Sequence, residues 1–180
     1  KLFEVCKLRQ VPVITFVNKC DRPGLSPLEV LSNIESKLGI EALPVTWPVG
    51  YGQNFQGIYD LRTRKLTLYE KQDHGSKMAE TQQFDLEEGI AATTLSDADK
   101  AAVLEEIELI ADMFETMDPE AYAIGRVTPV FFGSALNNFG LDLFLTYFKD
   151  LAPPPQSYPD ATGEDRALDA PFSGFVFKLQ

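Results

Sequence analysis

Two short polar motifs follow apolar runs in this chain, and their residue types suit one ligand. The first is Asn18-Lys19-Cys20-Asp21, directly after the apolar, β-branched run at residues 11–17. In open α/β sheets ligands bind at the carboxyl ends of strands, so this position favours contact with a ligand. An ionised Asp offers two acceptor oxygens, and guanine presents two adjacent donors, its ring N–H and its exocyclic amine. Adenine lacks that donor pair, so Asp21 predicts a site that selects guanine.

The neighbours of Asp21 have supporting roles in this hypothesis. Asn18 would tie the loop to neighbouring backbone, and the aliphatic stem of Lys19 would cover one face of the base. Asn and Asp are also ordinary turn residues, so the tetrad alone is equally consistent with a simple turn.

The second motif, Ser134-Ala135-Leu136, follows the apolar run at residues 128–132 and precedes a helical pattern. A small residue there lets backbone N–H groups approach a ligand, and the Ala135 N–H could donate to the guanine keto oxygen. Taken alone, the motif is also typical of a plain strand-to-helix loop. The two motifs in this order favour a guanine pocket formed by Asn18, Lys19, Asp21, Ser134, Ala135 and Leu136.

An α/β framework is expected to position these motifs. The runs at residues 11–17 and 128–132 are typical of strands buried on both faces of a parallel sheet, and another strand is expected at 43–49. A helix should begin with Ser26 as its N-cap and end at Gly39. A later helix at about 141–151 is expected to stop at the Ala-Pro-Pro-Pro run that follows it.

The middle of the chain predicts a different, α+β unit. Residues 57–61 and 65–70 are typical of an antiparallel hairpin, and a helix is expected from Ser96 or Asp97 to about residue 117. The predicted buried face of this helix is Val103, Ile107, Ile110 and Phe114.

Charge is concentrated in the same region. Between Glu70 and Glu120 there are 15 acidic residues against three lysines, a net charge of −12, within a chain whose total is −11. An acidic block does not attract a phosphate backbone, so this unit predicts a solvated surface or a contact with protein, and no nucleic-acid site.

Composition excludes several classes of function. Only His74 is available as a histidine, and Cys6 and Cys20 are the only cysteines, so zinc sites, disulfide frameworks and serine-type triads are not expected. No apolar run reaches membrane-spanning length, and no signal-peptide core is found at the start. A reducing cytoplasm is the expected location.

Four further features have ordinary interpretations. Residues 50–57 are rich in glycine, but their spacing fails that of a phosphate loop. Trp47 is expected to be a packing residue, and His74 a residue of a surface loop. Lys19 and Arg22 could lower the pKa of Cys20, whose presence in the motif we interpret as incidental.

The two motifs resemble the fourth and fifth guanine-binding motifs of P-loop GTPases. The phrases at residues 15–22, 44–50, 128–140 and 172–180 resemble translational GTPases of the elongation factor G-like class, and most closely its termination factors. The resemblance covers nearly the whole chain and is weakest from about residue 71 to 126. It implies that Asn18 and Asp21 read guanine, that Lys19 packs on it, and that Ser134 and Ala135 complete the pocket.

The resemblance also implies a fold and its parts. The fold class is α/β, the C-terminal half of a P-loop GTPase domain with an α+β insertion and the first strand of a following β-barrel domain. The expected parts are framework at 1–56, acidic insertion at 57–126, framework at 127–155, linker at 156–171 and the new domain from 172–180.

The implied activity is that of the intact protein. It would bind GTP and GDP and hydrolyse GTP in translation termination, with the ribosome and class I release factors as partners. No Gly-x-x-x-x-Gly-Lys-Ser/Thr sequence is found here. The phosphate loop, the switch regions and the magnesium ligands are therefore expected upstream, and this part alone should not hydrolyse GTP.

Other interpretations stay open at this stage. The chain could belong to an elongation factor G-like protein that acts in translocation or ribosome protection. It could also be a non-enzymatic interaction module that binds a ribosomal or factor protein through the acidic insertion. An enzyme unrelated to GTP has no nucleophile or acid–base constellation in its favour.

Overall fold

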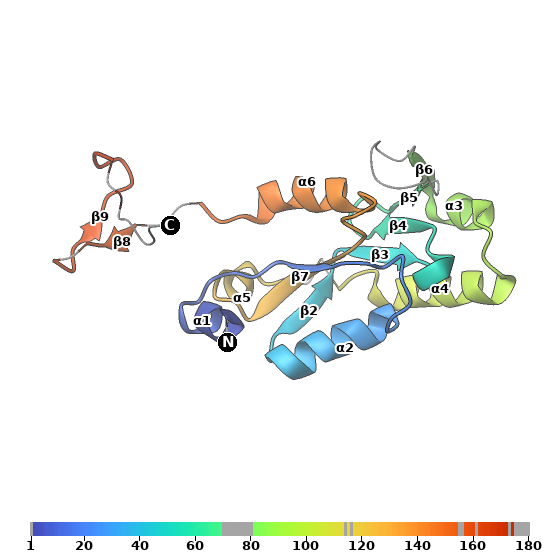
Figure 1. Cartoon of the computed structure of the whole chain (residues 1–180), viewed down its shortest axis with the longest axis horizontal. Coiled ribbons are helices and arrows are strands. Elements are labelled where there is room, and N and C mark those ends of the chain that lie inside the picture. Colours follow the sequence, from blue (N-terminus) through green and yellow to red (C-terminus); the bar gives the residue numbers. More distant parts are fainter. Residues whose placement is uncertain are drawn as a thin grey trace.

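The computed structural model describes residues 2–69, 81–113, 115, 117–154, 157–160, 162–172 and 174. Figure 1 shows a body with two sheets and a C-terminal hairpin that lies apart from it. His74 and Phe114 lie outside the described residues, as does most of the strand expected at 172–180.

The first sheet is parallel, with the strand order β1-β7-β2. Its strands are β1 (Thr15–Val17), β7 (Val127–Phe132) and β2 (Glu41–Pro44). Every residue of β7 is buried, which confirms the interpretation of this apolar run. The expected strand at 11–17 is shorter, and its three residues are only half-buried. The reason is its place at one edge of the described sheet, with β7 as its neighbour on one side.

The second sheet is antiparallel, with the order β3-β4-β5-β6. Its strands are β3 (Thr46–Val49), β4 (Gly57–Asp60), β5 (Lys65–Tyr69) and β6 (Thr81–Asp85). The β4–β5 hairpin confirms the predicted one. This sheet begins at β3, ahead of residue 57, where the insertion was expected to start; the domain boundaries stay predictions.

The chain passes between the two sheets at Val45, so the single strand expected at 43–49 was wrong. The Val45 N–H donates to Val130 O in β7 at 2.8 Å, and Val45 O accepts from the Leu61 N–H at 3.0 Å. Thr46 adds a side-chain link, because its hydroxyl accepts from the Phe132 N–H at 2.9 Å. The two sheets therefore share one continuous stretch of backbone.

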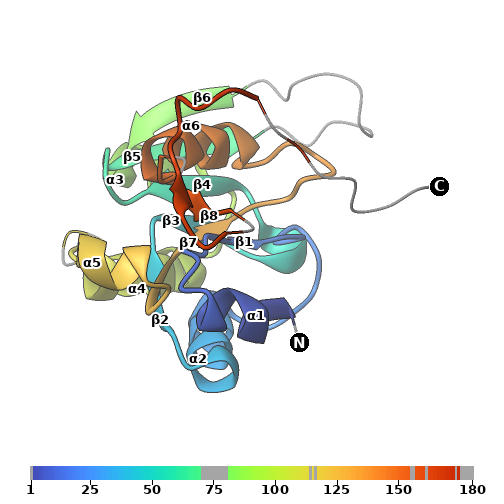
Figure 2. The same ribbon diagram turned by 90° about the vertical axis from the view of Figure 1, so that its left-hand side faces the viewer.

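Helices cover both faces of the parallel sheet (Figures 1 and 2). The helix α2 (Pro27–Leu38) lies on one face, and its N-cap Ser26 forms a capping box with Glu29, while Gly39 ends it at φ 63°. The helix α6 (Leu141–Leu151) lies on the opposite face. Strand β7 supplies both contacts, because Phe131 packs with Phe144 of α6 and Phe132 belongs to the core that includes Leu31 of α2.

The remaining helices are short or cover the antiparallel sheet. They are α1 (Leu2–Leu8), the 3-10 turn η1 (Gly52–Asn54), α3 (Leu86–Ala92), α4 (Asp97–Ile110) and α5 (Pro119–Ala123). Helix α4 begins at Asp97 with Ser96 as its N-cap, in agreement with the predicted start at Ser96 or Asp97, and it buries Val103, Ile107 and Ile110 as expected. It ends earlier than residue 117, and α5 then starts at Asp118–Pro119, where the proline disfavours a helical conformation of the residue before it.

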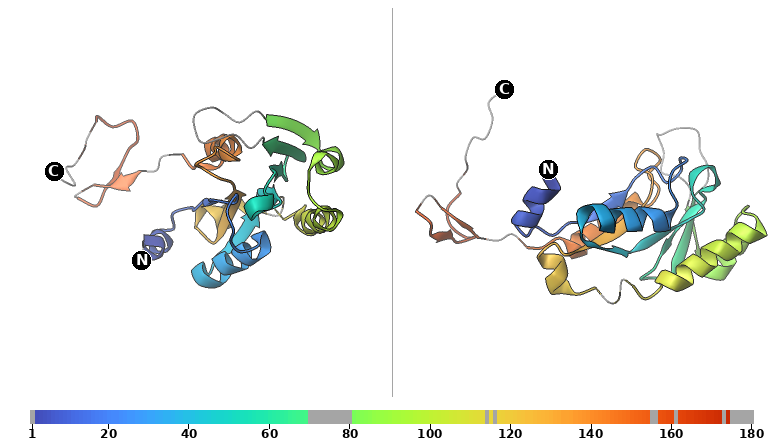
Figure 3. Two further views of the ribbon diagram at one scale, coloured as in Figure 1. Left: turned by 45° about the vertical axis from the view of Figure 1, so that its right-hand side comes forward. Right: turned by 90° about the horizontal axis from the view of Figure 1, so that it is seen from below.

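The segment expected to be a linker contains a small hairpin of its own. Its strands are β8 (Tyr158–Pro159) and β9 (Asp165–Arg166), and both views of Figure 3 show it apart from the body. Asp160 Oδ1 accepts from the N–H and the hydroxyl of Thr162 and so closes the turn. Among the described residues, no helix is long and apolar enough to cross a membrane.

Candidate guanine-nucleotide site

The two predicted motifs leave the carboxyl ends of adjacent parallel strands. Val17 at the end of β1 pairs with Phe132 at the end of β7. The pairing continues into the loops, where the Gly133 N–H donates to Val17 O and the Cys20 N–H donates to Gly133 O, both at 3.0 Å. The sheet thereby brings residues 18–21 and 134–136 together, as an open α/β sheet does at a ligand site.

Gly133 makes this approach sterically feasible. A Cβ at this position would lie 2.3 Å from Phe139 O and 2.8 Å from Cζ of Phe16. Both distances are well inside van der Waals contact, so any side chain would displace the backbone of Phe139 in the second loop or the ring of Phe16 in β1.

Asn18 forms the first of two cross-links between the loops. Its Oδ1 accepts from the Lys19 N–H at 2.8 Å and from the Ala135 N–H at 2.9 Å. Lys19 has φ 68°, a left-handed conformation that turns the chain sharply at this point. Asn18 thus ties its loop to backbone, and the partner is the very N–H expected to meet the guanine keto oxygen.

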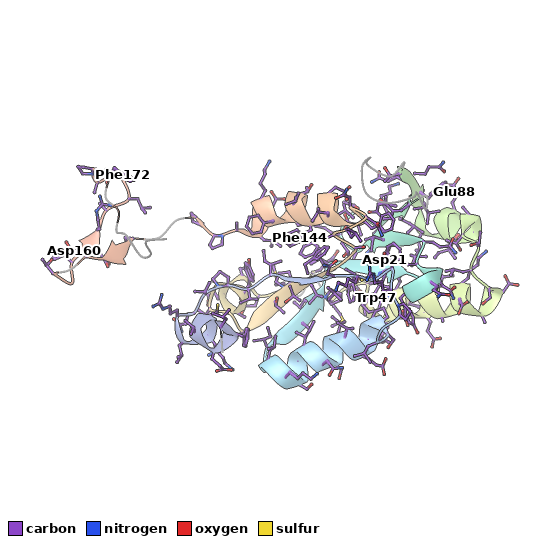
Figure 4. All side chains as sticks on the ribbon, in the orientation of Figure 1. Asp21, Trp47, Glu88, Phe144, Asp160 and Phe172 are labelled. Carbon is purple, nitrogen blue, oxygen red and sulfur yellow. The ribbon has the colours of Figure 1, made fainter. Side chains whose placement is uncertain are left out.

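Asp21 forms the second cross-link, and again the second loop donates and the first loop accepts. Asn137 Nδ2 donates to Asp21 Oδ2 at 2.7 Å. Asp21 Oδ1 is buried and has no hydrogen-bond partner within the described part of the chain. Figure 4 shows Asp21 in the region where the two sheets meet. A buried carboxylate oxygen without a donor is costly, so Asp21 fits a ligand that brings donors to it.

The other predicted residues differ in exposure. Ser134 is buried, and its backbone pairs with Phe139 in both directions, at 2.9 and 3.0 Å. Ala135 and Lys19 are exposed, and Leu136 is 59% exposed. Exposed aliphatic groups around the polar pair Asp21–Asn137 are suited to cover the faces of a planar base.

Asn137 and Tyr69 were missed as site residues by sequence reasoning. The Tyr69 hydroxyl, from β5 of the antiparallel sheet, accepts from the Gly140 N–H at 2.9 Å. Its ring lies 4.7 Å from that of Phe139, which also stacks on Phe55 at 5.4 Å. Burial raises the pKa of Tyr69, so it stays a neutral hydroxyl. The antiparallel sheet therefore supports the second loop directly.

The glycine-rich stretch at 50–57 supports the first loop. The Gly52 N–H donates to Cys20 O at 2.8 Å, and a Cβ at Gly50 would lie 2.1 Å from Asn54 O. A pocket of about 540 Å³ lies between this stretch and the second loop, and its lining includes Asp21, Phe55 and Asn137.

Cys20 and Trp47 are packing residues. Burial raises the pKa of Cys20 to about 11, so the suggestion that Lys19 and Arg22 could lower it was wrong. Its thiol donates to Val17 O at 3.3 Å. Trp47 is fully buried, as expected, and its indole N–H donates to Glu106 of α4 at 3.0 Å. Among the described residues, no group of His, Cys, Asp and Glu could hold a metal ion.

The comparisons with known proteins define the class. The family model of the elongation factor Tu GTP binding domain matches residues 1–154, and the chain belongs to this family of GTP-binding domains. A crystal structure of a protein from Thermus thermophilus has TM-score 0.55 and 22% identity, and the match covers 84% of this chain and 24% of that one. This likeness shows the fold alone.

The relatives narrow the class to one kind of factor. The chain is a homologue of peptide chain release factor 3, with 46% identity to that of Acaryochloris marina, 43% to that of Cyanothece sp. and 42% to that of Nostoc punctiforme. Each alignment covers 100% of this chain and 33% of the relative, so the chain spans about a third of their length. The predicted resemblance is confirmed.

Proposed function

We propose that this chain is the guanine-nucleotide-binding part of a translation termination GTPase, which recycles class I release factors from the ribosome. One observation carries the proposal. At the carboxyl ends of β1 and β7, Asn18 bonds to the Ala135 N–H and Asp21 bonds to Asn137. Nucleotides bind at this edge of open α/β sheets. The family match and the relatives named release factor 3 support the same conclusion, and they favour termination over translocation.

Each residue then has a chemical role. Asp21 would accept from the ring N–H and the exocyclic amine of guanine, which supply donors to its buried Oδ1. The stem of Lys19 and the side chain of Leu136 would cover the base. Ser134 holds the second loop through its backbone pair with Phe139. The Ala135 N–H donates to Asn18 in this structure, so it would meet the guanine keto oxygen only by exchanging that partner for the base.

Hydrolysis would depend on other parts of the longer protein. The 180 residues contain no Gly-x-x-x-x-Gly-Lys-Ser/Thr. That loop cradles the phosphates and helps to bind magnesium in P-loop GTPases. In this proposal the chain reads the base, does not hydrolyse GTP alone, and works in the cytoplasm. Its parts would be framework at 1–56 and 127–155, insertion at 57–126, linker at 156–171 and a β-barrel domain starting at 172–180.

Base selectivity tests the proposal. The full-length protein would be titrated with GDP, ADP and xanthosine diphosphate, as wild type and as Asp21→Asn. The wild type should prefer GDP by about 10⁴-fold over ADP, and the variant should shift towards the xanthine nucleotide because the amide donates where the carboxylate accepted. Asp112→Asn, an exposed carboxylate on the turn after α4, is the matched control. Equal affinity of the wild type for all three nucleotides would refute guanine recognition.

The termination role needs its own measurement. Release of a class I release factor from post-termination ribosomes should require GTP and should be slowed in the Asp21→Asn variant, with rescue by xanthosine triphosphate. Release that ignores the nucleotide would exclude the recycling role while leaving base recognition intact.

A further inference from the structure

Asn137, which bonds to Asp21, has no assigned role in binding the base so far. Asn137 Nδ2 donates to Asp21 Oδ2 at 2.7 Å across 116 residues of sequence. A carboxylate only accepts, so the amide must turn its NH₂ group towards Asp21. A distance of 2.7 Å is short for an N–H···O bond and typical of a charged acceptor.

The backbone around Asn137 is fixed, so its side chain is presented in one direction. The Asn137 N–H donates to Ser134 O at 3.3 Å, and Ser134 and Phe139 bond to each other in both directions. Asn138 has φ 58°, which closes the turn after Asn137. The next residues are held by Tyr69, through the Gly140 N–H and the Phe139 ring.

The carboxylate of Asp21 is held asymmetrically. Oδ2 accepts from Asn137, whereas Oδ1 is buried with no donor in the described part of the chain. A carboxylate has about four acceptor positions, so the bond from Asn137 still leaves both oxygens able to accept. What the bond removes is rotation of the carboxylate about its Cβ–Cγ axis. A carboxylate in one orientation loses less freedom when a planar base with two adjacent donors binds.

We propose that Asn137 is a positioning residue, which orients the Asp21 carboxylate for the two donors of guanine and so sets the strength of base discrimination. This inference rests on the proposed function. Asn137 acts through Asp21. Both donors of guanine must meet the carboxylate, so a misoriented carboxylate loses one of the two bonds.

Inosine diphosphate isolates this role, because hypoxanthine keeps the ring N–H and the keto oxygen of guanine but lacks its exocyclic amine. The full-length protein would be titrated with GDP, inosine diphosphate and xanthosine diphosphate. The variants are Asn137→Ala, Asn137→Asp and, as matched control, Asn138→Gly, which keeps the left-handed turn. Unfolding curves of each variant verify that the fold is intact.

The expected result is a change in selectivity. Asn137→Ala should weaken the binding of GDP about tenfold, because one hydrogen bond to a charged group is lost. It should weaken the binding of inosine diphosphate by less than about threefold. Asn137→Asp should weaken GDP further, since it places a second carboxylate beside Asp21. In an Asp21→Asn background, Asn137→Ala should leave the ratio of GDP to inosine diphosphate unchanged. Asn138→Gly should leave that ratio at its wild-type value.

Three results would overturn the inference. Equal weakening of all nucleotides by Asn137→Ala would make Asn137 merely structural. Tighter GDP binding by that variant would show that Asn137 competes with the base for Asp21. A wild type that ignores the base altogether would remove the proposed function itself, a failure distinguishable from the first two because it needs no variant.

Discussion

Asp60 and Asp21 are two carboxylates held in opposite ways. Asp60, at the end of β4, is 2% exposed. Its oxygens accept from the backbone N–H groups of Arg62 and Thr63, from the Thr63 hydroxyl and from the Tyr147 hydroxyl. Asp21, at the end of β1, accepts from Asn137 through one oxygen and leaves the other buried and unpaired among the described residues.

The difference separates structural from functional use of the same side chain. A buried carboxylate whose two oxygens both accept hydrogen bonds stabilises a turn, because donors from the protein replace the water that it lost on folding. One with an unpaired oxygen costs stability unless something else supplies the donor. Asp60 therefore closes the β4–β5 turn and links it to α6, while Asp21 is the carboxylate that the proposed function assigns to a ligand.

The largest expected effect is the stability lost at Asp60. Asp60→Ala should lower the free energy of unfolding by about 3 kcal/mol, because the Tyr147 hydroxyl is left buried without an acceptor and the β4–β5 turn loses the acceptor for its N–H groups. Asp21→Ala should lower it by less than about 1 kcal/mol, because the unpaired oxygen is removed along with the bond. Urea unfolding of both variants measures the difference; equal losses would break the comparison.

The Tyr147→Phe substitution separates the part of the stabilisation by Asp60 that comes from the Tyr147 hydroxyl. The Tyr147 hydroxyl donates at 2.8 and 2.9 Å to the two oxygens of Asp60, and the Arg62 guanidinium lies 5.6 Å from the centre of its ring. The substitution keeps the ring and removes the donor, so the expected loss is about 2 kcal/mol. The same unfolding experiment applies, with Tyr51→Phe at an exposed position as control. A loss as small as that of the control would mean that backbone donors alone satisfy Asp60.

The Tyr69→Phe substitution tests how far the antiparallel sheet supports the second loop, which bonds to Asp21. It leaves the Gly140 N–H without its acceptor, so stability should fall by about 1 kcal/mol. Because the second loop carries Ser134 and Ala135, GDP binding to the full-length protein should also weaken, by roughly twofold to fivefold. Unchanged GDP affinity would show that the antiparallel sheet supports the loop without influencing the base.

The smallest expected effect is on the neighbouring thiol. Burial is the main cause that raises the pKa of Cys20 to about 11, and the negative charge of Asp21 raises it further. The thiolate is the reactive form, so alkylation of Cys20 in the folded protein should be slow at about pH 8 and should rise as the pH approaches that pKa. Asp21→Asn removes the adjacent charge and should speed alkylation at about pH 9.5 by about twofold or less. Mass spectrometry separates Cys20 from Cys6; slower alkylation in the variant would contradict the expected effect of the neighbouring side chain on the thiol.

The local features of the fold were predictable because their causes are local. Ser26, Glu29 and Gly39 determine both ends of α2, and the alternation around residues 62–64 gives the β4–β5 hairpin. The motifs at residues 18–21 and 134–136 likewise follow the ends of strands, as the apolar runs that precede them predicted. We inferred the association of the two loops from their order and context. The pairing of Val17 with Phe132 at the strand ends brings the loops together.

The features that escaped prediction depend on contacts distant in sequence. Asn137 meets Asp21 across 116 residues, and Tyr69 meets Gly140 across 71. Neither side chain has a local pattern that distinguishes it from an ordinary loop or strand residue. The change of sheet at Val45 was hidden for the same reason, because nothing local in residues 43–49 shows which partner each half will pair with.

Val45 has a consequence for how the protein opens. Its peptide groups bond to Val130 of the parallel sheet and to Leu61 of the antiparallel hairpin. Each of the two amide protons should exchange with solvent deuterium when its own bond opens, the Val45 proton with the parallel sheet and the Leu61 proton with the antiparallel hairpin. Because the two bonds flank one residue, equal protection of these protons would mean that the two sheets open as a single cooperative unit, and unequal protection would mean that one sheet opens first.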